Sequence, residues 1–150
     1  MSEFIATFTR AAKLMRSAAD AAMIRHGVRV GQNLVLEALW ERDGQTPGQI
    51  ATGLGLATPT VVKMATRMET SGLLRRRPDE SDGRLVRLHL TELGLSLRES
   101  VMNELAELER RATALLTVAE RDQLRDGLAR MAAALADSTP AAPAPAPAED

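Results

Sequence analysis

The chain has no cysteine, no tyrosine, one tryptophan and two phenylalanines among its 150 residues. The lack of cysteine excludes disulfides, zinc sites with thiolate ligands, cysteine nucleophiles and cysteine-based redox sensing. With so few aromatic rings, a platform that stacks the bases of single-stranded nucleic acid is not expected. The two histidines, His26 and His89, are far apart and lack metal-ligand spacing. The sequence therefore predicts neither a metal site nor a cofactor.

Long hydrophobic runs are also missing, because no apolar segment approaches the roughly 18–20 residues that a membrane span needs. The first residues, MSEFIATFTRAAKLM, mix charged with apolar side chains and lack the apolar centre of a secretory signal. We therefore expect no membrane contact and a cytoplasmic location. An enzyme is not expected either, since the sequence has no paired His/Asp arrangement and no glycine-rich phosphate loop.

What the chain does have is a basic segment inside an otherwise acidic protein. Hydrophobic residues make up 45% of the chain, enough for one compact domain, and the formal net charge is −1. Residues 58–90 nevertheless hold seven Lys or Arg against four Asp or Glu. Because a polyanion responds to the local field, this segment is a candidate nucleic-acid contact. A solvated charged face is the commoner meaning of such a cluster.

Apolar residues recur at spacings of three and four outside the basic segment, which predicts helices at 3–26, 31–42, 91–116 and 118–137. Glycines end the first two helices, Thr91 caps the third, and a capping box from Thr117 to Glu120 opens the fourth. From residue 138 the chain alternates Ala and Pro, which cannot form a core, so 138–150 is predicted to be a disordered tail.

Two start signals, Thr46-Pro47 and Thr58-Pro59, predict a short helix to Leu54 and a second helix from Pro59 to Ser71, separated by Gly55. After Gly72 the apolar period changes to two, which predicts strands at 73–77 and 85–90 around an Asp-rich loop. The expected fold is therefore mainly α with a small β-hairpin. The order helix, tight turn, helix, hairpin is that of a winged helix-turn-helix.

In this layout the second helix of the pair presents its N-terminal end and polar face to the major groove of DNA. Free amides in its first turn favour a phosphate, polar side chains reach base edges, and small apolar ones touch thymine methyl groups. An arginine near the hairpin tip can enter the minor groove, and strand arginines can contact the backbone. The predicted helix contacts are Thr58 (phosphate), Thr60 and Lys63 (base edges), Pro59 and Val61 (thymine methyls) and Arg67; the predicted hairpin contacts are Arg84 at the tip with Arg75, Arg77 and Arg87.

The stretch TPGQIATGLGLATPTVVKMATRMETSGLLRRRPDESDGRLVRLHLTELG resembles the MarR family of winged-helix regulators. It covers about a third of the chain, and the order and spacing of its short motifs are more specific than any one of them. The chain departs from the family pattern at Gly83, where a second basic residue is common. The motifs are Pro47 to Ala51, Gly55 to Val61, Gly72 to Leu74, Asp82 with Arg84, and Leu90-Thr91.

The resemblance implies that Arg84 is the arginine of the wing and that Asp82 orients it through a salt bridge. It also implies a two-fold dimer, a palindromic operator, and repression relieved by a small aromatic or lipophilic ligand. The expected protein is thus a homodimeric transcriptional regulator of double-stranded DNA. Its parts would be an N-terminal dimerisation helix (1–30), a DNA-binding unit (31–91), C-terminal dimerisation helices (92–137) and the tail (138–150).

Two features leave alternatives open. The long amphipathic helices have more apolar face than the small central unit can cover, which favours a dimer, although the faces could bury one another within a monomer. A helical adaptor that binds a partner protein without DNA would explain these faces and the Pro-rich tail, but not the position of the basic segment. The sequence does not identify the operator, the regulated genes or the effector, and it does not distinguish repression from activation.

An effector pocket is expected between the dimerisation helices and the DNA-binding unit. Met15, Met23 and Trp40 would line a pliable apolar cavity there, and His26 would sense the ligand. The ordinary alternatives are core positions for the methionines and Trp40, and a capping or surface position for His26.

Overall fold

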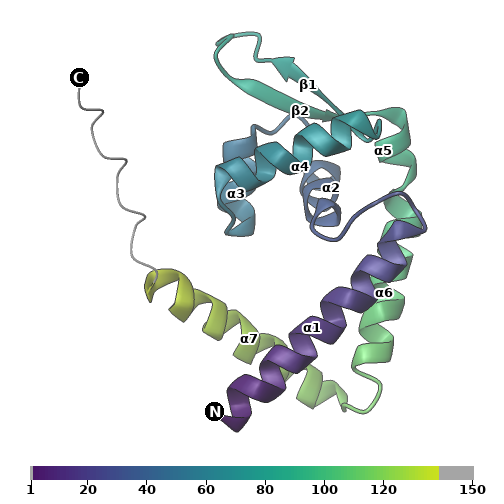
Figure 1. Ribbon diagram of the computed structural model, residues 1–150, viewed down its shortest axis with the longest axis vertical. Coiled ribbons are helices and arrows are strands. Elements are labelled where there is room, and N and C mark those ends of the chain that lie inside the picture. Colours follow the sequence, from purple (N-terminus) through teal and green to yellow (C-terminus); the bar gives the residue numbers. More distant parts are fainter. Residues whose placement is uncertain (1, 139–150) are drawn as a thin grey trace. The chain divides into compact units, whose positions relative to one another are not determined.

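A computed structural model describes residues 2–138 and divides the chain into two compact units with a boundary between Ala114 and Leu115. The first unit holds six helices and a two-stranded sheet, and the second holds one helix (Figure 1). The predicted tail beyond residue 138 lies outside the described residues. The elements are α1 (Glu3–Ile24), α2 (Gln32–Glu41), α3 (Pro47–Leu54), α4 (Thr58–Thr70), β1 (Leu74–Pro78), β2 (Val86–Leu90), α5 (Glu92–Ser96), α6 (Arg98–Ala112) and α7 (Val118–Ser138).

Local sequence signals explain most of the helix boundaries. At the start of α3, Thr46 Oγ1 accepts a hydrogen bond from the Gln49 amide and Gln49 Oε1 accepts one from the Thr46 amide, which is the predicted capping box. Gly55 ends this helix in the left-handed conformation, with φ of 66°. Thr91 caps α5 by accepting from the Gly94 amide at 3.1 Å. Thr117 and Glu120 form the expected capping box at α7.

Two helix predictions are wrong in detail. The N-cap of α4 is Ala57 rather than Thr58, which is the first helical residue, so Pro59 occupies the second helical position. The single helix predicted from Thr91 to Leu116 is interrupted, because α5 ends at Ser96 and α6 begins two residues later and ends at Ala112. The Ser96 hydroxyl donates to the Leu93 carbonyl oxygen at 2.8 Å, a local bond that competes with regular helix.

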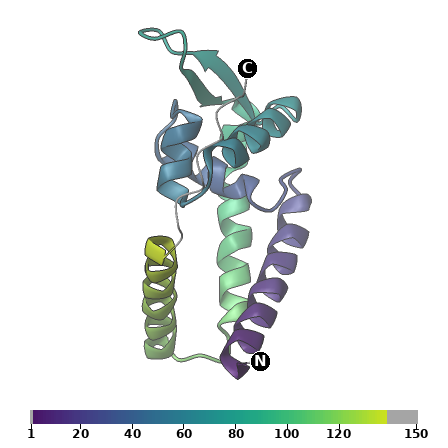
Figure 2. The ribbon, with the colours of Figure 1, turned by 60° about the vertical axis from the view of Figure 1, so that its left-hand side comes forward.

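The core of the first unit lies beneath α2, α3, α4 and the hairpin, and it includes the end of α1 and part of α6. These elements meet because each turns one apolar face inward, leaving the opposite face polar. Helices α1 and α6 run side by side (Figure 1 and Figure 2). The buried hydrophobic residues of this core are Ala22, Met23, Val28, Val35, Leu36, Leu39, Ile50, Ala51, Val61, Ala65, Met68, Leu73, Leu74, Leu88 and Val101.

The hairpin is antiparallel, with Leu74 opposite Leu90, Arg76 opposite Leu88 and Arg77 opposite Arg87. Since residues directly opposite each other share a face, the leucines and Arg76 face the helices while Arg75, Arg77, Arg87 and His89 share the other face. The connection from α2 to α3 adds a bridge to Leu88 in the middle of β2. The Leu88 amide donates to the Gln45 carbonyl oxygen at 2.9 Å, and the Gly44 amide donates to the Leu88 carbonyl oxygen at 3.0 Å.

Large apolar side chains on the long helices are uncovered. Phe4, Phe8 and Met15 of α1 are exposed, as are Leu124 and Leu128 of α7. Among the described residues, no helix is both long enough and apolar enough to cross a membrane.

Candidate nucleic-acid interface

Helix α4 separates cleanly into a buried and an exposed face. Val61, Ala65 and Met68 have no exposed surface, so the predicted contact of Val61 with a thymine methyl group is wrong: its side chain lies in the core beneath the helix. Its neighbour Val62 is 40% exposed, so Val62 and not Val61 is the valine that can contact a partner; the sequence analysis did not select it. The spacing of four and three from Val61 to Ala65 and Met68 is the signal that identifies Val61 as an inward residue.

The exposed face of α4 holds the other predicted contacts. Thr58, Pro59 and Thr60 of the first turn are exposed, as are Lys63 and Arg67. Neither Lys63 nor Arg67 has an ion-pair partner among residues 2–138. This face therefore presents two uncompensated positive charges to an approaching polyanion.

Fewer first-turn amides are free than the sequence suggested. Pro59 has no N–H, and the amides of Thr60 and Val61 donate to the Ala57 carbonyl oxygen at 3.0 and 3.3 Å. Ala57 has no side-chain oxygen to cap the helix. In the described part of the chain the Thr58 amide is left without an acceptor, so it is the main-chain donor that a phosphate can use.

A clamp between Glu69 and Arg76 joins α4 to β1. Arg76 donates from its amide to Glu69 Oε2 at 2.7 Å and from Nε to Oε1 at 3.0 Å, and a third bond reaches Thr66 Oγ1 at 3.3 Å. The backbone hydrogen bond from Arg76, followed by its side-chain bond, lowers the pKa of Glu69. One cation of the basic segment is thus used to hold the hairpin against α4.

Arg75 and Arg77 lie on the other face of the hairpin from Arg76. Neither has an ion-pair partner among the described residues, and together with His89 they line a hollow of about 210 Å³. His89 is itself 3.4 Å from Asp43 Oδ2 through its Nδ1. The structure therefore does not place these two arginines on the face that packs against α4.

The loop at the hairpin tip is organised by Asp79. Its Oδ1 accepts hydrogen bonds from the amides of Ser81 and Asp82 at 2.8 and 2.9 Å, and its Oδ2 accepts from Arg87 Nε. Arg87 also donates to the Gly44 carbonyl oxygen at 2.8 Å. The guanidinium that was predicted to contact the DNA backbone therefore has two internal acceptors, and it ties the loop to the α2–α3 connection.

Asp82 continues this network to the tip. Its Oδ1 accepts from the Arg84 amide at 3.1 Å and lies 3.7 Å from Arg84 Nε, so the predicted Asp82–Arg84 ion pair is present as a long one. The Arg84 side chain is 95% exposed. An unbroken series of contacts thus runs from Gly44 through Arg87, Asp79 and Asp82 to Arg84.

Acid should loosen this loop. The side-chain bond from Arg87, with the amides of Asp82 and Ser81, lowers the pKa of Asp79 from 3.8 to about 2. A carboxyl group with a lowered folded-state pKa stabilises the native state above its unfolded pKa, and this contribution disappears as the pH falls from about 4 to about 2. We expect the Ser81 and Asp82 amides to lose hydrogen-exchange protection over that range. In Asp79→Asn the same amides should show no such transition, and a transition unchanged by this substitution would contradict the assignment.

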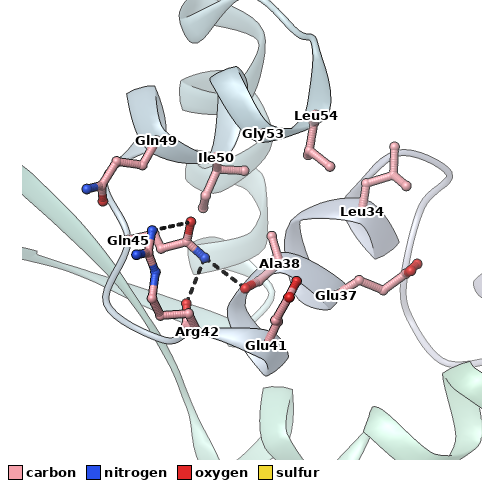
Figure 3. A pocket seen from close by; sticks show the side chains of 10 residues that line it. All are labelled: Leu34, Glu37, Ala38, Glu41, Arg42, Gln45, Gln49, Ile50, Gly53 and Leu54. Carbon is pink, nitrogen blue, oxygen red and sulfur yellow. Dashed lines mark hydrogen bonds between the residues drawn. The ribbon is translucent and has the colours of Figure 1, made fainter.

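None of the four residues predicted to line an effector pocket lines any of the four cavities described for this structure. Met23 is completely buried in the core, whereas Met15 is exposed on α1. His26 Nε2 lies 3.3 Å from Glu104 Oε1, and the Trp40 indole N–H donates to the Gly94 carbonyl oxygen at 2.9 Å. A cavity of about 670 Å³ lies instead between α2 and α3, and none of the four lines it (Figure 3).

Comparisons with known proteins agree with this architecture. Residues 30–86 match the model of the MarR family. The chain is 30% identical over 130 residues to the HTH-type transcriptional regulator PecS of Dickeya dadantii (strain 3937), covering 85% of this chain and 78% of that protein. The S. aureus MepR–DNA complex superposes with a TM-score of 0.81 at 25% identity, covering 89% of this chain and 99% of that one. CouR from Rhodococcus jostii RHA1 bound to p-coumaroyl-CoA gives a TM-score of 0.76 at 25% identity, covering 87% of this chain and 92% of that one. The expected winged-helix fold is confirmed.

Proposed function

Because this chain belongs to the MarR family of winged-helix transcriptional regulators, we propose that it binds a palindromic operator as a homodimer and represses transcription until a small ligand releases it. The observation that supports DNA binding best is the exposed face of α4. It presents Lys63 and Arg67 without ion-pair partners among the described residues, on the same side of the helix as Thr60. Its relatives are DNA-binding regulators rather than enzymes or adaptors, and the cytoplasmic location stays a prediction.

Two elements would divide the contacts with DNA. Helix α4 would enter the major groove, where Thr60 and Lys63 reach base edges and Thr58 meets a phosphate. Arg84 at the hairpin tip would enter the adjacent minor groove, oriented by Asp82. The similarity to a regulator solved with DNA supports this arrangement. Further contacts from Pro59, Arg67, Arg75, Arg77 and Arg87 remain part of the proposal.

The uncovered apolar faces support the homodimer. Residues 1–30 and 92–137 would pair two subunits, because the exposed phenylalanines of α1 and the leucines of α7 need a partner surface to leave water. A two-fold dimer places two copies of α4 one helical turn of DNA apart or a multiple of it, and such a pair recognises a palindrome. Release by an aromatic or lipophilic ligand is supported by the similarity to CouR, whose structure contains p-coumaroyl-CoA.

Selection of bound sequences from a random DNA pool should return a palindrome, and Lys63→Ala should then weaken binding to it by about 1–3 kcal/mol, with little effect on random DNA. The reason is that a side chain on base edges contributes to specific binding alone. Competition titrations of both DNAs at one salt concentration measure the difference. Lys13→Ala on α1 removes the same charge and is the control.

The result for Lys63 separates two roles. An equal loss on the selected and the random DNA would make Lys63 a backbone contact. Recovery of no common sequence from the pool would contradict the proposed operator-binding function itself.

A further inference from the structure

The cavity between α2 and α3 has the size of a small-molecule site. Its volume is about 670 Å³, within the range of roughly 300–1,000 Å³ that such sites occupy. It lies wholly inside the first unit, and its walls come from two helices that face each other (Figure 3). It shares no residue with the exposed face of α4, so a molecule bound there would not compete directly for the DNA-contacting side chains.

The floor of the cavity is apolar. Ile50 is buried at its base, with Ala38 of α2 and Leu54 of α3 partly buried beside it. Leu34, near the N-terminal end of α2, also lines the cavity, and it is 39% exposed. Leu34 and the apolar floor together offer surface that a bound molecule would remove from water.

Gly53 enlarges this cavity at a cost to its helix. It is a helical residue near the end of α3 with no positive φ, and Gly55 already supplies the left-handed residue that ends the helix. A Cβ atom built at Gly53 would meet nothing within 4 Å. Glycine destabilises a helix relative to alanine, and neither backbone geometry nor packing requires a glycine at position 53. The need for open space for a ligand would explain why glycine is found there.

The rim of the cavity is acidic on its α2 side. Glu37 and Glu41 lie one helical turn apart and both line the cavity. Glu37 accepts a hydrogen bond from Asn33 Nδ2 at 3.1 Å, whereas Glu41 has no hydrogen-bond or ion-pair partner within residues 2–138. Arg42, at one end, donates to Gln45 Oε1 at 3.4 Å. The two carboxylates outnumber this one cation, so the rim favours a positive ligand.

We propose that the cavity between α2 and α3 binds a small organic cation with an apolar body. Glu37 and Glu41 hold the charged end, and the floor receives the body. The missing side chain at Gly53 leaves room for it. The occupant is thereby defined by chemistry: an alkyl or aromatic ammonium, and not an anion or a neutral hydrocarbon.

The position of Gln45 connects this site to the hairpin. Its side chain lines the cavity and donates from Nε2 to the carbonyl oxygens of Ala38 and Arg42, both at 2.8 Å. Its own carbonyl oxygen accepts from the Leu88 amide in β2. An occupant that shifts Gln45 therefore shifts the middle of β2. This regulatory part rests on the proposed function, and it predicts that the cation weakens operator binding at least about fivefold.

Binding is tested on the full chain with benzyltrimethylammonium as the probe and benzoate as its anionic counterpart. We expect saturable binding of the cation with a Kd of about 1 mM or tighter, amide chemical-shift changes at Glu41, Gly53 and Leu54, and no such changes with benzoate. Weaker or unsaturable binding, or equal binding of benzoate, would overturn the proposal.

Two substitutions give the sharper result. Glu41→Gln should weaken the cation at least about fivefold, while Glu99→Gln on α6 should leave binding unchanged. Gly53→Ala should raise the melting temperature, because alanine favours helix, and at the same time weaken binding. Gly48→Ala in the same helix, outside the cavity lining, should not weaken binding. Unchanged affinity in both Glu41→Gln and Gly53→Ala would refute the site.

The operator titration separates this inference from the proposed function. If the chain binds no selected operator, the proposed function fails while the cation site is judged on its own data. If the operator binds and the cation does not, the site alone fails. If the cation binds and operator affinity is unchanged, the regulatory link through Gln45 is overturned.

Discussion

Replacing Gly94 with alanine should destabilise the first unit by about 3 kcal/mol or more, at or above the upper end of typical overpacking costs. A Cβ atom at this position would lie 2.2 Å from the Leu73 carbonyl oxygen and 3.1 Å from Leu90 Cδ2. The nearest atom belongs to the backbone and cannot rotate away. That oxygen already accepts the Thr91 amide, and the Gly94 carbonyl oxygen accepts the Trp40 indole N–H, so the strain would spread to α2 and β2.

Urea unfolding followed by tryptophan fluorescence measures this effect, since Trp40 is bonded to the residue that changes. Gly48→Ala is the matched control, because its Cβ would meet the Thr46 hydroxyl oxygen at 3.9 Å, an ordinary contact. We expect the urea midpoint of the control to equal that of the parent protein or to lie slightly above it. A Gly94→Ala midpoint close to that of the control would show that α5 moves away from the core without cost.

Replacing Arg84 with alanine should weaken binding to the selected operator by about 1–3 kcal/mol and reduce the slope of log K against log salt by about one unit if Arg84 contacts a phosphate. The side chain is 95% exposed, so its removal leaves the core unchanged and the loss reports on DNA contact. Titrations at several salt concentrations provide both quantities. Arg110→Ala removes an equal charge from α6, where Arg110 pairs with Glu107 of the same helix, and it should change neither quantity.

The network behind Arg84 makes the test more specific. Asp79→Asn removes the carboxylate that holds Arg87 and the loop amides, so it should weaken operator binding through Arg84. Combining Asp79→Asn with Arg84→Ala should then reduce operator affinity little more than Arg84→Ala alone, because Asp79 acts through Arg84. Strictly additive losses would show that Asp79 does not position Arg84, and unchanged binding in Arg84→Ala would overturn the minor-groove contact.

Much of the fold is predictable from short segments. The capping boxes at Thr46 and Thr117, the cap at Thr91 and the left-handed glycines depend on residues within a few positions of each other, so their signals are local. The hairpin follows from its change of period and its Asp-rich loop. The interruption between α5 and α6 was missed, because the apolar stripe continues through it and only the Ser96 bond marks the place.

The candidate site was predicted less completely. Lys63 and Arg67 lie on the exposed face because helical periodicity alone determines which side of α4 is polar. The same periodicity would have excluded Val61, which is buried in the core. Nothing local indicated that Arg76 binds Glu69, or that Arg87 binds Asp79 and the Gly44 carbonyl oxygen, since these pairs depend on how α4, the hairpin and the α2–α3 connection pack together.

The winged helix-turn-helix and its family therefore came from the sequence by itself, because periodicity, caps and motif spacing are encoded over a few residues at a time. Only the tertiary structure decided which arginines remain available to a polyanion and which are used as internal ties. It also decided that Met23 lies in the core while Met15 is exposed on α1, and that a cavity opens between α2 and α3. The physical reason is common to these cases. Burial, ion pairing and empty space are relations between segments distant in the chain, and no single segment contains them.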